Sequence, residues 1–322
     1  MANLLGWPLV KPRARVIIDN DYSGDPDDLV QTAHHLLSPT VEIAFFVPSH
    51  LSAGDPWNPS GQQASNAEAV LRQLLAIMGV EDQFAIHRGA ENAIADRSTP
   101  QDSAAARAII AEAMRTDTDL PLFYAAGAGL TDLASALLIE PAIAKRMTLV
   151  WIGGPEYPDL APPPPGAHGP EYNLRIDIAA AQLVFASGMA IWQVPRNVYR
   201  QVLLSYAELI TSVGDHGALG AYLQQAIEAV MQRTSEIGFN IGETYAMGDS
   251  PLVTLTALQS AFEADPSSSF YQSRPRPTIR DDGTYGPPAT DLPPIRVYTQ
   301  IDTRLTFADF FAKLQLWARA KG

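Results

Sequence analysis

RVIIDNDYSGDPDD, residues 15–28, joins a short apolar run to a dense group of acidic side chains. The run at 14–19 has the composition of a buried strand, and residues 27–37 carry apolar side chains at helical spacing. Carboxylates at such density repel one another, so the segment needs a compensating interaction. Between the end of the strand and the first helical turn lie Asp19, Asp21, Asp25, Asp27 and Asp28.

The rest of the chain repeats this order of strand and helix. Repeated βα units predict an α/β fold with a mainly parallel sheet flanked by helices on both faces. No internal repeat or linker interrupts the pattern, so we expect a single domain over residues 1–322. Further strands are expected at 41–49, 84–89, 120–127, 146–154, 190–196 and 295–301, and further helices at 66–79, 104–115, 130–139, 176–188 and 307–318.

Three other segments complete this prediction. The proline-rich residues 155–173 should form a stiff loop over the carboxyl edge of the sheet, because proline is excluded from helix and strand interiors. Two or three helical elements are expected from about residue 203. Residues 265–294 are predicted to be irregular.

Composition narrows the class of protein. The chain has 322 residues, of which 47% are hydrophobic and 18% charged, as in globular proteins. Its net charge of -13 argues against a nucleic-acid partner, because phosphate binding requires a basic surface. There is no cysteine, no apolar stretch long enough to span a membrane, and no secretory signal pattern. We therefore expect a cytoplasmic protein that does not contact membranes.

Three interpretations of the acidic segment can be drawn from its spacing alone. An EF-hand calcium loop fits the spacing of oxygens, but Val30 stands where a bidentate Glu is required. A magnesium-dependent haloacid-dehalogenase-like phosphatase would use Asp19 as nucleophile and Asp21 as acid/base, but its later lysine and acidic pair are not convincingly placed. An ordinary helix N-terminus accounts for one or two carboxylates, but not for those at the buried end of a strand. A divalent cation with hard oxygen ligands would relieve the repulsion.

A fourth interpretation comes from a resemblance that extends along most of the chain. Residues 19–28 resemble the Asp-x-Asp-Pro-Gly-x-Asp-Asp signature of the inosine–uridine-preferring nucleoside hydrolases, with two extra residues before the final pair of aspartates. The resemblance implies a Rossmann-like nucleoside hydrolase core. Other segments resemble that family's motifs in the same order: SNAEAVLRQLL (65–75), IHRGAENAI (86–94), GAGLTDLASALLIEPAIAKRMTLVWIGG (127–154), EYNLRIDIAAAQLVFASG (171–188) and GDSPLVTLTAL (248–258).

The resemblance also implies an activity and a set of residues. The activity is hydrolysis of the N-glycosidic bond of a ribonucleoside or related ribosyl compound by a calcium-bound water, with release of base and ribose. Asp21 would be the general base. The implied calcium ligands are the carboxylates of Asp21, Asp28 and Asp249 and the main-chain carbonyl of Gly127. The implied ribose-binding residues are Asp27, Glu171 and Asn173.

The chain departs from the family pattern at further positions. His50 stands where the family has Asn and is a candidate for a sugar contact. Gly248 stands where some members have a His that assists departure of the base, and the sequence does not select a substitute among Tyr245, His50 and His168. A binding protein with weak or no turnover therefore remains an alternative. The family also implies a homodimer or homotetramer.

Overall fold

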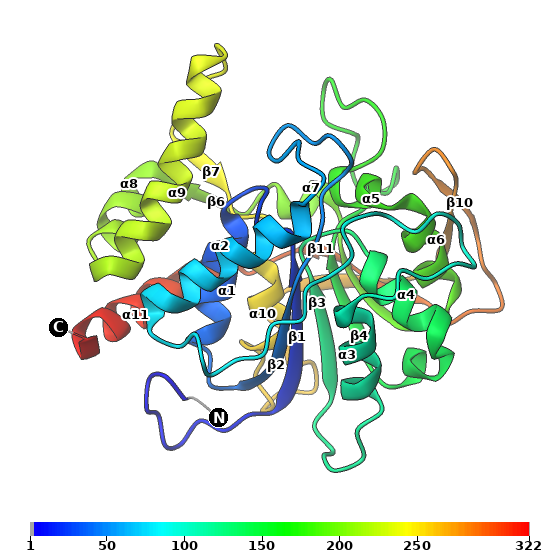
Figure 1. Cartoon of the computed structure of the whole chain (residues 1–322), viewed down its shortest axis with the longest axis horizontal. Helices are drawn as coiled ribbons and strands as arrows, with labels where there is room; N and C mark the ends of the chain where they lie inside the picture. The colour runs from blue at the N-terminus through cyan, green and yellow to red at the C-terminus, as the bar shows by residue number, and fades with distance from the viewer. Residues whose placement is uncertain (1–2, 322) are drawn as a thin grey trace.

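A seven-stranded sheet forms the centre of the molecule (Figure 1). The computed structural model describes residues 3–321. Neighbouring strands are parallel except for β11 and β8, which pair antiparallel at one edge, so the predicted mainly parallel α/β fold is confirmed. In spatial order the strands are β2 (Val41–Pro48), β1 (Ala14–Asn20), β3 (Leu122–Ala126), β4 (Thr148–Ile152), β5 (Ala190–Val194), β11 (Ile295–Gln300) and β8 (Phe270–Arg274).

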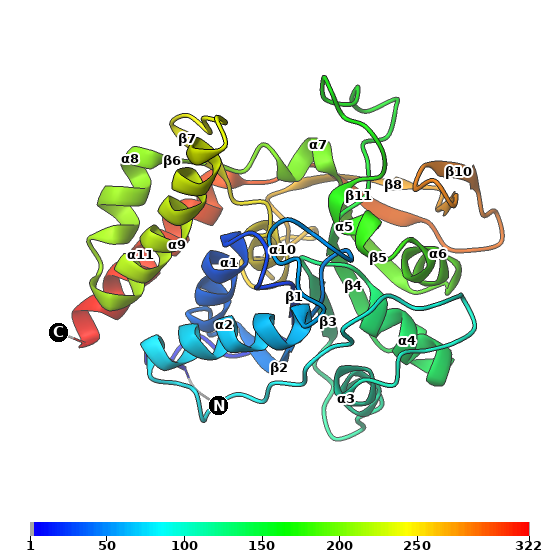
Figure 2. The ribbon, with the colours of Figure 1, turned by 45° about the horizontal axis from the view of Figure 1, so that its top comes forward.

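Helices cover both faces of the sheet (Figure 2). The inner strand β1 is buried along its whole length, with Val16 and Ile18 in one hydrophobic core and Ile17 in the other. Because successive side chains of a strand point to opposite faces, such an apolar run requires cover on both sides. The first core contains α1 (Asp27–Leu36), α2 (Gln63–Met78), α9 (Gly217–Glu236), α10 (Pro251–Thr256) and α11 (Thr303–Lys321), and the second contains α3 (Ala104–Ala113), α4 (Thr131–Ile139) and α6 (Ile178–Ala186).

Two predictions about strands are wrong. Residues 84–89 run along β2, but they form only an isolated bridge between Phe46 and Ile86. Residues 265–294 are not irregular, since they contain β8 and the hairpin of β9 (Pro277–Ile279) and β10 (Tyr285–Pro288). The prolines of this segment argued against strands, but edge strands and short hairpins tolerate a residue without an N–H group.

Shorter elements connect the main ones. Residues 155–171 contain neither helix nor strand, as predicted, and form a loop that projects from the body of the molecule (Figures 1 and 2). Within residues 3–321, no helix combines the length and apolar composition that crossing a membrane requires. The short elements are η1 (Pro141–Lys145), α5 (Tyr172–Ile176), α7 (Arg196–Tyr199), β6 (Leu203–Ser205), α8 (Tyr206–Glu208), η2 (Leu209–Gly214) and β7 (Thr244–Ala246).

The carboxyl ends of β1, β3 and β4 are adjacent at one edge of the sheet. The chain leaves these strands at Asp21, Gly127 and Gly153. In open parallel sheets, ligands bind beyond this edge. The fold therefore gathers three segments that are distant in sequence at the expected location of a site.

Trp151 fixes part of this edge, and its substitution should measure the strength of that contact. The indole is fully buried in β4 and donates a hydrogen bond of 3.0 Å to the carbonyl oxygen of Ala128, the residue after Gly127. We expect Trp151→Phe to lower the free energy of unfolding by about 1–3 kcal/mol in urea, because the buried carbonyl loses its partner. Trp192→Phe is the matched control, since the Trp192 indole has no hydrogen bond to residues 3–321. Equal losses in both variants would contradict this role.

Candidate active site

An acidic cavity of about 220 Å³ lies at the carboxyl edge of the sheet. Its walls come from the loop after β1, the first turn of α1, the segments after β3 and β4, the start of α5, and the segment between β7 and α10. Aromatic side chains complete the wall. The aspartates that line it are Asp21, Asp25, Asp27, Asp28 and Asp249.

The cavity brings together most of the residues that the sequence indicates. Asp249 lies next to the first acidic segment, and its backbone N–H donates a 3.0 Å hydrogen bond to Oδ2 of Asp27. This bond joins the two segments across more than two hundred residues of sequence. The residues indicated by the sequence that line the cavity are Asp21, Asp27, Asp28, Gly127, Glu171, Asn173 and Asp249.

His50 is the exception among the indicated residues. It is buried, and its two ring nitrogens each lie 2.8 Å from a partner, the carbonyl oxygen of Leu51 and Oγ1 of Thr131. It is not among the described residues that line the acidic cavity. Its imidazole therefore supports the β2–α4 region in this structure.

Three carboxylate oxygens of the cavity are buried without a hydrogen-bond partner among residues 3–321: Asp21 Oδ2, Asp28 Oδ2 and Asp249 Oδ2. A buried carboxylate oxygen without a donor is costly unless a cation or a proton compensates it. Carboxylate oxygens of Asp27, Asp28 and Asp249 also lie within 4.8 Å of one another. Asp21 is outside that trio, but Asp27 already accepts the Asp249 N–H, so we favour the three side chains with unpartnered oxygens as ligands. The donor set fits a hard divalent cation such as calcium.

The aspartates of the cavity raise one another's pKa values, in addition to the effect of burial. Burial raises the pKa of Asp21, Asp27 and Asp28 well above that of an ordinary carboxyl group, and neighbouring aspartates, Asp249 foremost for Asp21 and Asp28, raise it further. Burial also raises the pKa of Asp249 to about 7. In the absence of a cation, the cavity therefore favours protonated carboxyl groups.

The opposite wall is held by a fixed network of hydrogen bonds. Asn173 Nδ2 donates to the carbonyl oxygens of Gly127 (3.1 Å) and Ile152 (2.8 Å). Glu171 caps α5 by accepting the Leu174 N–H at 3.0 Å, and it also accepts the hydroxyl of Tyr199 at 2.6 Å. Both side chains are thus oriented before any ligand binds.

The three candidate substitutes for the missing His lie elsewhere. Tyr245 donates its hydroxyl to Asp25 Oδ1 at 2.7 Å, and His168 is exposed in the loop that follows β4. The space beside Gly248 is limited instead by Tyr199, whose ring carbon would lie 3.4 Å from a Cβ at that position. Among residues 3–321, no histidine lines the acidic cavity.

Five lining residues were not assigned a role from the sequence: Asp25, Trp57, Ile152, Tyr172 and Tyr199. Asp25 lies between Asp21 and Asp27, in the stretch that is two residues longer than the family signature. Asp55 links Trp57 and Tyr172, because its carboxylate accepts the Tyr172 hydroxyl at 2.9 Å and the backbone N–H of Trp57 at 3.0 Å. Only the short spacing of Tyr172 from Glu171 and Asn173 could have indicated one of them.

A model of the family described as inosine-uridine preferring nucleoside hydrolase matches residues 16–304. The chain belongs to this family. The match includes every aspartate of the cavity together with Glu171 and Asn173, and it decides against the phosphatase interpretation. Nucleoside hydrolases are glycosidases that act on N-glycosyl compounds, and this chain is an enzyme of that class. A comparison with curated proteins finds no match.

Solved structures of nucleoside hydrolases share the fold. A plant nucleoside hydrolase is 20% identical, with a TM-score of 0.71 over 94% of this chain and 99% of that chain. A purine-preferring ribonucleoside hydrolase from Gardnerella vaginalis is 18% identical, with a TM-score of 0.72 over 95% and 99%. An inosine-uridine preferring nucleoside hydrolase from Bacillus anthracis is 16% identical, with a TM-score of 0.68 over 94% and 99%. At these identities the likeness establishes the fold.

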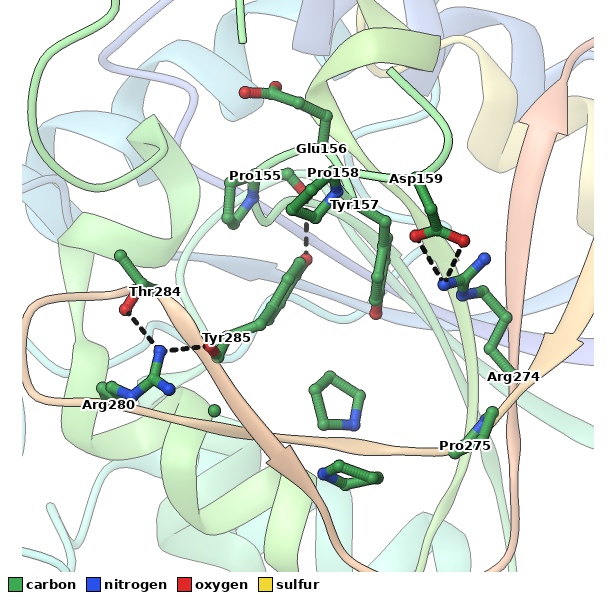
Figure 3. Close-up of a pocket in the computed structure, with 13 residues that line it drawn as sticks. Pro155, Glu156, Tyr157, Pro158, Asp159, Arg274, Pro275, Arg280, Thr284 and Tyr285 are labelled. Carbon is green, nitrogen blue, oxygen red and sulfur yellow. Dashed lines mark hydrogen bonds and ion pairs between the residues drawn. The ribbon is translucent and has the colours of Figure 1, made fainter. Parts of the chain in front are cut away.

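A second, larger cavity of about 670 Å³ lies between the loop after β4 and the β9–β10 hairpin (Figure 3). Its carboxylates are already paired, Asp159 with Arg274 and Glu156 with Arg196. The ring of Tyr285 stacks on that of Tyr157 at 4.4 Å between centroids. Its carboxylates are therefore satisfied by ion pairs, in contrast to the acidic cavity, which contains unpartnered carboxylate oxygens.

The carboxylates should make the metal-free protein less stable as the pH rises. Burial raises the pKa of Asp19 to about 8 and that of Asp249 to about 7, from an ordinary value of 3.8. At a pH between the ordinary and the raised pKa, the folded state binds more protons than the unfolded chain. The free energy of unfolding therefore falls as the pH increases from about 4 to about 8. Urea unfolding with a chelator present measures this slope.

Asp249→Asn should reduce that slope, because one of the titrating groups is removed. The exposed Asp82→Asn serves as the matched control and should leave the slope unchanged. A free energy of unfolding that is constant or rises from pH 5 to pH 8 in the wild-type protein would contradict the raised pKa values.

Proposed function

We propose that this protein hydrolyses the N-glycosidic bond of a ribonucleoside with the help of a calcium ion, and that Asp21 is the general base. The three buried, unpartnered carboxylate oxygens carry this proposal. Asp21, Asp28 and Asp249 would hold the cation together with the carbonyl oxygen of Gly127. When bound, calcium would supply the positive charge that neutralises these carboxylates, lowers the pKa of water and attracts sugar hydroxyls.

The side chains of this cavity can perform the remaining tasks. Asp21 lies in the cavity with an oxygen free to accept a proton from water. Asp27 keeps Oδ2 on the Asp249 N–H, which leaves Oδ1 for a ribose hydroxyl. Asn173 uses its amide N–H groups on the backbone, which leaves its oxygen to accept from the sugar. Glu171 adds negative charge near a sugar that becomes cationic as the glycosidic bond breaks.

Trp57, Tyr172 and Tyr199 favour a flat, apolar group in the same cavity. Aromatic side chains bury large areas and pack against rings, so they suit a nucleobase. The plant and Gardnerella nucleoside hydrolases support ribonucleosides as the substrate class. Neither the cavity nor these relatives select a base for this chain.

Other expectations remain predictions. A homodimer or homotetramer, a cytoplasmic location, the absence of a nucleic-acid partner and a single domain over residues 1–322 follow from the sequence and the family resemblance. Small-molecule nucleosides as substrates agree with the family match.

Substitution of the general base tests the proposal directly. With calcium present, Asp21→Asn should lower the rate of ribose release from inosine or uridine by about 10²- to 10⁴-fold, because the amide cannot accept the proton. A chelator should abolish wild-type turnover, and calcium should restore it. The exposed Asp82→Asn should retain full activity. Turnover that is insensitive to chelator, or an Asp21→Asn variant as active as the wild type, would contradict this mechanism.

Among residues 3–321, no imidazole lines the acidic cavity, so no histidine there can protonate the departing base. Without a proton donor at the leaving group, the rate should depend strongly on how stable the departing anion is. We expect 4-nitrophenyl β-D-ribofuranoside to be cleaved at least 100-fold faster than inosine in kcat/KM, measured by absorbance. Equal values would show that another group protonates the base.

The assays with inosine and 4-nitrophenyl β-D-ribofuranoside also distinguish an active enzyme from a binding protein without turnover, the alternative that Gly248 favours. Calorimetry that detects nucleoside binding, combined with no product from either substrate, would support that alternative.

A further inference from the structure

Asn20 is the last residue of β1 and lies between Asp19 and Asp21. Its side chain is fully buried, and its amide oxygen Oδ1 has no hydrogen-bond partner. Neither the family resemblance nor the proposed mechanism gives this side chain a role. A buried amide oxygen without a donor costs free energy, so a compensating group is expected.

A relay of hydrogen bonds fixes the direction of this oxygen. Thr256 donates its hydroxyl to the carbonyl oxygen of Leu252 at 2.6 Å, so it accepts from Nε2 of His35 at 2.8 Å. The other ring nitrogen of His35 is then unprotonated and accepts from the amide N–H of Gln31. Gln31 consequently presents its oxygen to Asn20, whose Nδ2 donates to it at 2.7 Å.

The relay leaves one orientation for the Asn20 amide. A flipped amide would place two oxygens, Asn20 Oδ1 and Gln31 Oε1, against each other. Thr32 also donates its hydroxyl to Gln31 Oε1 at 3.2 Å, which further opposes a flip of the Gln31 amide. Asn20 Oδ1 is therefore directed away from α1.

This oxygen lies behind Gly127, next to the acidic cavity, although Asn20 is not among the described residues that line the cavity. A Cβ atom at Gly127 would overlap Asp249 Oδ2 and would lie 2.8 Å from Asn20 Oδ1. The two oxygens thus approach the same side of the residue whose carbonyl is an expected cation ligand. Together with Asp21 Oδ2 and Asp28 Oδ2, four buried side-chain oxygens without partners gather in this part of the structure.

We propose that Asn20 is a further residue of the cation site, where its amide oxygen stabilises the bound cation from behind Gly127, and that Gln31, His35 and Thr256 are positioning residues for it. This inference rests on the proposed calcium dependence. An amide oxygen attracts a hard cation without adding negative charge to a cavity that already contains five aspartates. Residues that orient or supplement metal ligands typically change affinity by about 10- to 100-fold.

Calorimetric titration of the metal-free protein with calcium chloride tests the proposal without reference to activity. Asn20→Leu keeps the size of the side chain and removes its oxygen, so it should weaken calcium binding by about 10- to 100-fold. Asn197→Leu is the matched control, because Asn197 also has a buried oxygen without a partner among residues 3–321 but belongs to α7 and not to the end of β1, and its affinity should equal that of the wild type.

Gln31→Met tests the positioning role and does not depend on the Asn20 variants folding. It should weaken calcium binding in the wild-type background and have no effect when combined with Asn20→Leu. Wild-type affinity in both Asn20→Leu and Gln31→Met would overturn the inference while leaving the calcium site intact. A wild-type protein that binds no calcium would overturn the proposed function together with this inference.

Discussion

Repulsion among buried carboxylates is the constraint on which the site depends. Eight residues, from the end of β1 to the start of α1, contain Asp21, Asp27 and Asp28. The fold brings Asp249 next to them from more than two hundred residues further along the chain. Each is buried, and Asp21, Asp27 and Asp249 raise the pKa of neighbouring carboxyl groups. Protons or a cation can neutralise such a group, so we expect the arrangement to weaken the metal-free protein, and it is the basis of the proposed affinity for a divalent ion.

The surrounding structure keeps these carboxylates in place. The Asp249 N–H bonds to Asp27, Trp151 secures the segment after Gly127, and Asn173 links Gly127 to the end of β4. These contacts connect the carboxyl ends of β1, β3 and β4, which the parallel sheet places at one edge, with α5 and the segment after β7. The site is thus a consequence of the topology, and the hydrogen bonds prevent the carboxylates from relaxing apart.

Much of this could be predicted from sequence. Strong apolar runs such as 14–19 and 120–127 identified the inner strands, and the family motifs identified seven residues of the cavity. Prediction failed where local pattern is weak: β8 contains exposed polar residues and is set by pairing with β11, which sequence alone does not reveal. The same limit applies to His50, whose partner Thr131 is 81 residues away.

The aromatic wall and the Asn20 relay were beyond sequence reasoning for a related reason. Trp57 and Tyr199 reach the cavity from loops whose paths depend on tertiary contacts, such as the bond between Tyr199 and Glu171. The orientation of the Asn20 amide depends on Thr256, which follows it by more than two hundred residues. Neither pattern nor propensity encodes such contacts.

A crystal structure of the protein grown with calcium and ribose tests the central claim most directly. The account predicts one calcium ion within about 2.3–2.6 Å of carboxylate oxygens of Asp21, Asp28 and Asp249, with ribose bound beside it. Ordered water among these oxygens with no ion, or a calcium ion held only by other residues, would contradict it.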